Sequence, residues 1–240
     1  MQDIRITVVY DNNADKPGLE VGWGFSAAVR VAERTVLFDT GREGALLGNL
    51  EKLAIEPNSI EVIVLSHIHP DHSGGLESFL GKKSDVAVYL PKSFPSNFKD
   101  NVRGFGAEIV EVGQCLEICA DVYSTGELGR WIKEQSLILR TDKGLIVITG
   151  CAHPGIVKVV SRVKELLKDD ILLVMGGFHL EWTWQGKIEK VVSALKERGV
   201  EYVGPGHCSG EKARDLLEKD FGENYIKIGA GSVIRAADLE

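Results

Sequence analysis

Histidine and carboxylate side chains gather in one short segment of this 240-residue chain. Three of the six histidines stand within the segment His67-Ile68-His69-Pro70-Asp71-His72. Neutral imidazoles with one carboxylate suit Zn²⁺, Fe or Mn²⁺ better than Ca²⁺ or Mg²⁺, which prefer oxygen ligands. A tight loop can direct His67 and His69 to one ion, and Asp71 and His72 to a second. The segment therefore predicts a site for two divalent metal ions. Zinc is the favoured metal, and iron or manganese are the alternatives.

The other histidines, His153, His179 and His207, each follow a glycine-containing segment at the predicted end of a strand. Core filling explains such placement poorly, although a hydrogen-bonded structural imidazole is the plain alternative for each. We predict that His153 and His207 are further metal ligands. His179 is predicted to contact either a metal ion or the substrate.

The four cysteines fall into two groups by context. Cys115 and Cys119 lie in the apolar segment Cys-Leu-Glu-Ile-Cys and are predicted to pack in the core. Cys151 and Cys208 each stand close to a histidine. In a long chain without a recognisable secretion signal, thiols more often pack, react or bind metal than form disulfides. For Cys151 two alternatives stay open, a contact of the metal or substrate and no role at all.

An apolar run directly precedes the histidine-rich segment. Residues 62–65 are Val-Ile-Val-Leu, a pattern typical of a strand buried on both faces. Sheets of the α/β class place functional residues in loops beyond the carboxyl ends of their strands. We therefore expect the segment in such a loop.

Strands and helices follow one another along the rest of the chain. Helices are predicted where apolar residues recur every three or four positions, at 46–53, 156–167, 188–195 and around 216–217. Residues 92–107 are predicted to be irregular, and 136–141 with 145–149 to form a hairpin. Without repeats or linkers, one layered α/β domain over 1–240 is expected. The other predicted strands are 4–10, 25–31, 35–38, 86–90, 109–112, 121–124, 171–175, 200–203 and 225–228.

Composition narrows the class of partner. Hydrophobic residues make up 44% and charged residues 26%, with a formal net charge of −7. The sequence lacks the cluster of basic residues that is typical of nucleic-acid-binding proteins. No apolar run reaches the roughly 20 residues that a membrane-spanning helix needs. The amino terminus does not resemble a secretion signal. We expect a cytoplasmic protein with a small-molecule substrate, no nucleic acid and no membrane; a homo-oligomer stays open.

Two motifs together resemble a known family. His-x-His-x-Asp-His after an apolar strand, with Leu37-Phe38-Asp39-Thr40-Gly41 before it, is similar to the metallo-β-lactamase fold superfamily. Segments 149–155, 176–180 and 206–210 resemble its branch of metal-dependent hydrolases related to 7,8-dihydropterin-6-methyl-4-(β-D-ribofuranosyl)-aminobenzene-5′-phosphate synthase. The resemblance implies an α/β fold, a four-layer αββα sandwich of the metallo-β-lactamase type.

The resemblance also implies roles for single residues. His67 and His69 match ligands of a first metal ion. Asp71, His72 and His207 match ligands of a second. Asp39 matches the residue that orients the histidine loop from behind the ligands.

Two departures from the family pattern matter. The histidine expected near residues 124–127 is missing, and His153 is predicted to replace it. The usual Thr-Gly-Asp motif is here Thr149-Gly150-Cys151, so a cysteine stands where the resemblance implies a bridging carboxylate. His179 could also substitute for His207.

The implied activity is that of a binuclear metallohydrolase, in which a metal-activated hydroxide attacks an ester, amide or phosphoester. Asp71 would hold the second ion and accept the proton of the nucleophile, as the catalytic residue. One alternative is a synthase of the tetrahydromethanopterin type, a transferase that joins a pterin to an aminobenzene ribotide phosphate, with Trp182 and Trp184 stacking on a flat ring. Another is a metal-binding protein without catalysis.

Overall fold

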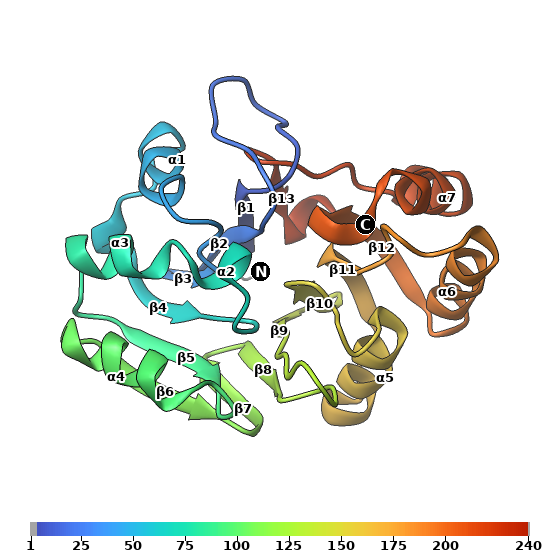
Figure 1. Cartoon of the computed structure of the whole chain (residues 1–240). Coiled ribbons are helices and arrows are strands. Elements are labelled where there is room, and N and C mark those ends of the chain that lie inside the picture. The colour runs from blue at the N-terminus through green and yellow to red at the C-terminus, as the bar shows by residue number, and fades with distance from the viewer. Residues whose placement is uncertain (1–3, 240) are drawn as a thin grey trace. The chain divides into compact units, whose positions relative to one another are not determined.

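The computed structural model describes residues 4–239, which form two compact units. Unit 1 takes the chain up to Gly113 and from Gly229 onward, and unit 2 is Gln114–Ile228. Each unit contains one sheet and its own helices (Figure 1). The α/β class is confirmed, and a single domain over residues 1–240 stays a prediction.

Unit 1 is built on a seven-stranded mixed sheet in the order β13-β1-β2-β3-β4-β5-β6. From β3 to β6 neighbouring strands are parallel, and the register pairs Phe38 with Val64, so the carboxyl ends of β3 and β4 meet. The strands are β1 (Ile4–Tyr10), β2 (Ser26–Val31), β3 (Arg34–Phe38), β4 (Ile60–Val64), β5 (Ala87–Pro91), β6 (Glu108–Val112) and β13 (Val233–Arg235). The helices are α1 (Leu46–Lys52), α2 (Pro70–Ser73), α3 (Leu76–Lys82) and α4 (Ser96–Gly104), with short 3₁₀ turns at Pro57–Ser59 (η1) and Ala236–Asp238 (η4).

Helices α1, α3 and α4 cover one face of this sheet. Leu37, Ile63 and Val88 stand side by side in the register of β3, β4 and β5, and all three belong to one buried cluster. Leu50 of α1 and Phe79 of α3 pack into the same cluster. The apolar positions that predict the helix after residue 45 thus face the sheet.

Unit 2 is built on a six-stranded mixed sheet in the order β12-β11-β10-β9-β8-β7. Strands β10, β11 and β12 are mutually parallel, whereas β9 and β10 form the predicted antiparallel hairpin. The strands are β7 (Gln114–Cys119), β8 (Val122–Gly126), β9 (Leu137–Thr141), β10 (Gly144–Thr149), β11 (Ile171–Gly177) and β12 (Val200–Gly206). The helices are α5 (Ile156–Leu167), α6 (Gln185–Glu197) and α7 (Glu211–Phe221), with 3₁₀ turns at His207–Ser209 (η2) and Gly222–Asn224 (η3).

Helices α5, α6 and α7 lie together over one face of the unit 2 sheet (Figure 1). Alternate residues of β10, Leu145 and Val147, point into the cluster that these helices bury. Val160 of α5 and Ile188 of α6 meet them there. Helices that pack on this face leave the carboxyl ends of the parallel strands to the loops.

The segment 92–107, predicted to be irregular, contains helix α4. Its inward face carries a lysine, because Lys99 is buried, donates from Nζ to the Lys92 carbonyl at 2.7 Å and pairs with Glu111 at 2.9 Å. This buried polar position interrupts the apolar stripe that would reveal the helix. Pro95 precedes the first turn, where proline suits a helix start.

Two further sequence predictions are wrong. Residues 225–228 form no strand: Ile226 N–H donates to the Val203 carbonyl at 2.8 Å, and pairing with β12 stops at that single bridge. The final strand is instead β13, which pairs with β1. Cys115 and Cys119 lie half-buried on β7, an edge strand with one neighbour, and not inside the core.

Between residues 4 and 239, every helix is too short or too polar to span a lipid bilayer.

Candidate metal centre

The histidine-rich segment lies beyond the carboxyl end of β4, as the sequence predicts. β4 is a central strand with parallel neighbours on both sides, and Ser66 and His67 follow it within three residues. Asp39 follows the adjacent strand β3 and its N–H donates to the Val64 carbonyl at 2.8 Å. The parallel register therefore brings Asp39 behind the histidine loop.

Backbone hydrogen bonds fix the path of this loop. The His72 carbonyl accepts from Thr40 N–H at 2.7 Å and from Thr40 Oγ1 at 3.0 Å. The Asp71 carbonyl accepts from Phe25 N–H at 3.2 Å. Pro70 begins the short helix α2, a position that proline suits because its missing N–H is not needed there.

The buried carboxylate of Asp39 organises the side chains of the loop. It accepts from Ser66 N–H at 2.6 Å, from Ser66 Oγ at 2.7 Å and from His72 Nδ1 at 2.7 Å. Both Asp39 and His72 are fully buried. A buried carboxylate needs such donors because it has lost its water.

The same bonds select the tautomers of two histidines. An ionised carboxylate only accepts, so Ser66 Oγ gives its single proton to Asp39 and accepts from His67 Nδ1 at 2.9 Å. His72 Nδ1 likewise donates to Asp39. In the neutral form of both imidazoles Nε2 is then the lone-pair nitrogen, which is the nitrogen available to a metal ion.

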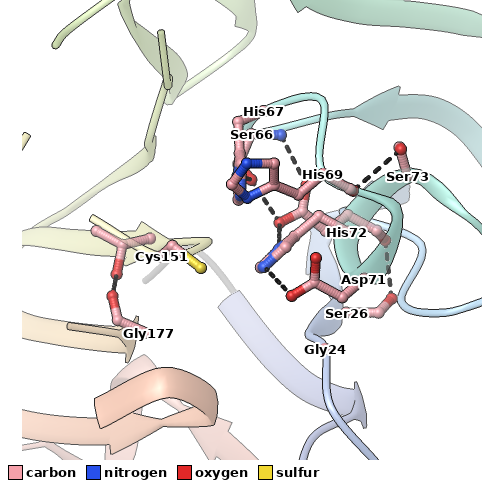
Figure 2. A network of polar contacts seen from close by, with 12 residues as sticks. Gly24, Ser26, Ser66, His67, His69, Asp71, His72, Ser73, Cys151 and Gly177 are labelled. Carbon is pink, nitrogen blue, oxygen red and sulfur yellow. Dashed lines mark hydrogen bonds and ion pairs between the residues drawn. The ribbon is translucent and has the colours of Figure 1, made fainter. Parts of the chain in front are cut away.

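The ligand atoms converge in pairs within unit 1 (Figure 2). His67 Nε2 and His69 Nδ1 lie 3.1 Å apart. Two nitrogens on one tetrahedral zinc ion, each at about 2.05 Å, would be about 3.3 Å apart. Asp71 Oδ2 lies 3.5 Å from His72 Nε2. The donor types and the spacing of the first pair fit a divalent metal ion of the zinc class.

Negative charge surrounds His72. Burial opposes the charged imidazole, but the carboxylates of Asp39 and Asp71 outweigh it and raise the pKa of His72 to about 10. The negative potential that holds this proton also favours a divalent cation at the same place.

In unit 2 the parallel strands bring three loops to one edge. β10 leads to Cys151 and His153, β11 to His179, and β12 to His207 and Cys208. Neighbouring parallel strands end at the same edge of a sheet, which is why residues far apart in sequence meet here. The sequence predicts this placement of the three glycine-flanked histidines.

Hydrogen bonds join the three loops to one another. Gly177 N–H donates to the Gly150 carbonyl at 3.1 Å, and Phe178 N–H donates to Ser209 Oγ at 3.1 Å. At Gly177 a Cβ would overlap the Gly150 carbonyl and lie 2.8 Å from Cys208 Sγ. Only glycine permits this close approach of β11 to the neighbouring loops.

Glu134 anchors the loop after β10. Its carboxylate, buried with 1% exposure, accepts the N–H groups of Cys151 at 2.9 Å, Ala152 at 2.8 Å and His153 at 2.8 Å. Three donors replace the water that the carboxylate has lost. Glu134 thereby fixes the backbone positions of Cys151 and His153.

In unit 2 the thiol of Cys208 and the imidazole of His179 shift each other's pKa toward the charged forms. Burial opposes a Cys208 thiolate, but hydrogen bonds from Cys151, His179 and His207 hold the pKa of Cys208 well below its usual range. The hydrogen bond with Cys208 in turn raises the pKa of His179, against a smaller effect of burial. The ligand atoms of Cys151, His179 and Cys208 all lie within 4.8 Å of one another.

Four non-glycine residues of these loops adopt left-handed backbone conformations. They are Asp39 in unit 1, with φ of 55°, and Ala152, His179 and His207 in unit 2, with φ of 58°, 54° and 43°. Such conformations persist only where the surrounding structure over-determines them, and they concentrate at functional sites.

The structure thus brings together His67, His69, Asp71 and His72 with Asp39 in unit 1. It brings together Cys151, His153, His179 and His207 in unit 2, where the rings of His153 and His179 have centroids 4.4 Å apart. The metal-binding and catalytic roles of these residues stay predictions. Sequence reasoning missed Ser66, Glu134 and the part played by Cys208, and only Ser66, beside the histidines, carries a local signal.

Comparison with known proteins gives a consistent result. A family model described as the metallo-beta-lactamase superfamily matches residues 21–165. A 7,8-dihydropterin-6-methyl-4-(β-D-ribofuranosyl)-aminobenzene-5′-phosphate synthase of Methanocaldococcus jannaschii is 28% identical over 249 aligned positions, covering 85% of each chain.

Solved structures agree. The crystal structure of a metal-dependent hydrolase of the β-lactamase superfamily is 32% identical, with a TM-score of 0.82 and coverage of 96% of this chain and 98% of that chain. The metallo-β-lactamase fold protein YhfI from Bacillus subtilis is 14% identical, with a TM-score of 0.77 over 98% of this chain and 100% of that chain. The second likeness is one of fold alone.

Removing the Glu134 anchor should destabilise the protein. Glu134→Ala leaves two buried N–H groups and one partly buried N–H group without their acceptor, so we expect a loss of about 3 kcal/mol in the free energy of unfolding. Glu134→Gln keeps one acceptor oxygen and should lose less. Urea unfolding checks this, with the exposed Glu165→Ala as control. Equal midpoints for Glu134→Ala and Glu165→Ala would refute the anchoring role.

The raised pKa of His72 makes the stability of metal-free protein depend on pH. The folded protein holds this proton more tightly than the unfolded chain, whose pKa is near 6.5. The resulting stability is complete below about pH 6.5 and is lost as the pH rises toward 10. Thermal unfolding of chelator-treated protein across this range measures it. Asp39→Asn should flatten the profile; parallel profiles would contradict the assignment.

Proposed function

Because the chain belongs to the metallo-β-lactamase superfamily, we propose that it is a binuclear metal-dependent hydrolase acting on an ester, amide or phosphoester of a small molecule. The observation that carries this proposal is the convergence of His67 Nε2 and His69 Nδ1 at 3.1 Å. The hydrogen bonds that orient His67 through Ser66 and His72 through Asp39 support it, since ligands held in advance bind metal more tightly.

We assign the ligands as the sequence predicts. His67, His69 and His153 would hold a first ion. Asp71, His72 and His207 would hold a second. Cys151 and His179 are further candidates, and Cys151 offers a soft sulfur ligand that would favour zinc.

Two divalent ions, when bound, would lower the pKa of a water molecule toward about 7 and polarise the bond to be broken. Asp71 is only partly buried, so its carboxylate is open to accept a proton from the attacking water. The carboxylate of Asp39 binds Nδ1 of His72, so that Nε2 of His72 points away from Asp39. The full burial of His67 and His72 keeps bulk water from competing for their ring nitrogens.

Replacing single ligands tests the assignment. Asp71→Ala and His69→Ala should abolish turnover of bis(4-nitrophenyl) phosphate or 4-nitrophenyl esters, because each removes a ligand and Asp71→Ala also removes the proton acceptor. Metal content per chain, measured by elemental analysis, should fall below the two equivalents expected of the parent protein. The exposed Asp85→Ala, in the same unit, is the matched control. Full turnover in either ligand variant would sink the proposal.

A second candidate is a synthase that joins a pterin to an aminobenzene ribotide phosphate. The similarity to the Methanocaldococcus jannaschii synthase, which covers 85% of this chain, favours it. Trp182 and Trp184 are 78% and 65% exposed, so their rings are open to stack on a flat ligand.

One experiment separates the two candidates. The metal-loaded protein is incubated either with the pterin and ribotide pair or with the phosphodiester and ester panel. A hydrolase should turn over at least one member of the panel and leave the pair unchanged. Formation of the joined product, detected by mass spectrometry, would favour the synthase instead.

A further inference from the structure

Unit 2 contains a cavity of about 500 Å³ that no step of the proposed hydrolysis uses. It lies between the loop 129–133, which connects β8 to β9, and the residues that follow β10. Arg130, Trp131, His153 and Lys158 line it. The volume is within the range of pockets that hold small molecules.

Backbone hydrogen bonds hold the loop 129–133 in a defined conformation. Leu128 N–H donates to the Glu134 carbonyl at 2.8 Å, and Glu134 N–H donates to the Leu128 carbonyl at 2.9 Å, which closes the loop at its base. Gly129 has a φ of 98°, and a Cβ there would overlap the Ile132 carbonyl. The tight turn holds Trp131 outward, and the residue is 91% exposed.

Such exposure of an indole ring is unusual, because tryptophan side chains are on average highly buried in folded proteins. Contact of this apolar ring with water is unfavourable. The face of the ring is open to a planar partner, and stacked aromatic pairs are favourable beyond their area. Arg130 lies with its guanidinium carbon 5.9 Å from the Trp131 ring centre, a cation–π distance that keeps the two side chains together.

The cavity is positively charged. Within residues 4–239 neither Arg130 nor Lys158 forms an ion pair with another side chain, and no carboxylate lines the cavity. Two cations without counter-charges attract an anionic group, and arginine suits phosphate or carboxylate through its planar fork. His153, a proposed metal ligand, forms part of the wall.

We propose that this cavity binds the part of the substrate that carries a planar aromatic ring and an anionic phosphate or carboxylate. Trp131 stacks on the ring, and Arg130 with Lys158 bind the anion. The link to catalysis rests on the proposed function, because it runs through His153. The binding itself does not need hydrolysis to occur.

Calorimetric titration of the metal-loaded protein tests the proposal with four probes. Phenylphosphonate and benzoate carry both a ring and an anion, methylphosphonate carries only the anion, and benzyl alcohol only the ring. The first two should bind the parent protein best, and more weakly as salt is added. Trp131→Ala should weaken phenylphosphonate about three- to tenfold and leave methylphosphonate unchanged. Arg130→Ala and Lys158→Ala should weaken both phosphonates about five- to tenfold.

A matched control lies elsewhere in unit 2. Lys187→Ala removes another exposed lysine of unit 2, which has no proposed role in binding, and this variant should bind as the parent does. Repeating the titrations after chelation removes any direct binding to metal, and the differences between variants should persist.

Several results would overturn the proposal. They are an absence of saturable binding to the parent, equal binding by all variants, or binding lost entirely on chelation. A change of oligomeric state in Trp131→Ala with unaltered binding would assign Trp131 to an interface between copies. Because turnover is not measured, failure of the hydrolase proposal would leave these results intact, and an active enzyme without this binding would overturn only the cavity proposal.

Discussion

A carboxylate that leaves water must find other hydrogen-bond donors, and this requirement shapes both units of the chain. In unit 1 the donors for Asp39 are the N–H and hydroxyl of Ser66 and the ring of His72. In unit 2 the donors for Glu134 are three successive N–H groups beginning at Cys151. Each acid obtains its hydrogen-bond donors from a loop that carries candidate metal ligands, and the same hydrogen bonds fix the position of that loop.

The two anchors act on different parts of their loops. Asp39 binds side chains and thereby selects which nitrogen of each imidazole keeps its lone pair. Glu134 accepts the backbone N–H groups of Cys151, Ala152 and His153. Asp39 therefore controls proton positions, whereas Glu134 controls the path of the chain. The left-handed backbone at Asp39 and Ala152 shows that both loops are held against local preference.

Much of this arrangement is readable from the sequence, because it follows from periodicity and spacing. The apolar run at 62–65 places the histidines at a strand end, and the glycine-flanked histidines mark three more. Helix α4 escapes detection because the Lys99–Glu111 pair lies where apolar residues are expected. Glu134 escapes because its partners lie 17 to 19 residues away in sequence. Long-range polar contacts leave no periodic trace, so tertiary structure alone reveals them.

The hydrogen-bonded pair at Leu128 and Glu134 separates two kinds of residue within a few positions. On one side stands a buried acid whose replacement would disturb the neighbouring loop. On the other side the loop 129–133 begins and ends at this hydrogen-bonded pair, and none of its five residues belongs to the buried core. A change in the length or composition of that loop would therefore leave the core intact, whereas a change at Glu134 would remove the hydrogen bonds that hold the loop after β10. The loop 129–133 could therefore be redesigned for a different ligand while Glu134 and the core of unit 2 stay unaltered.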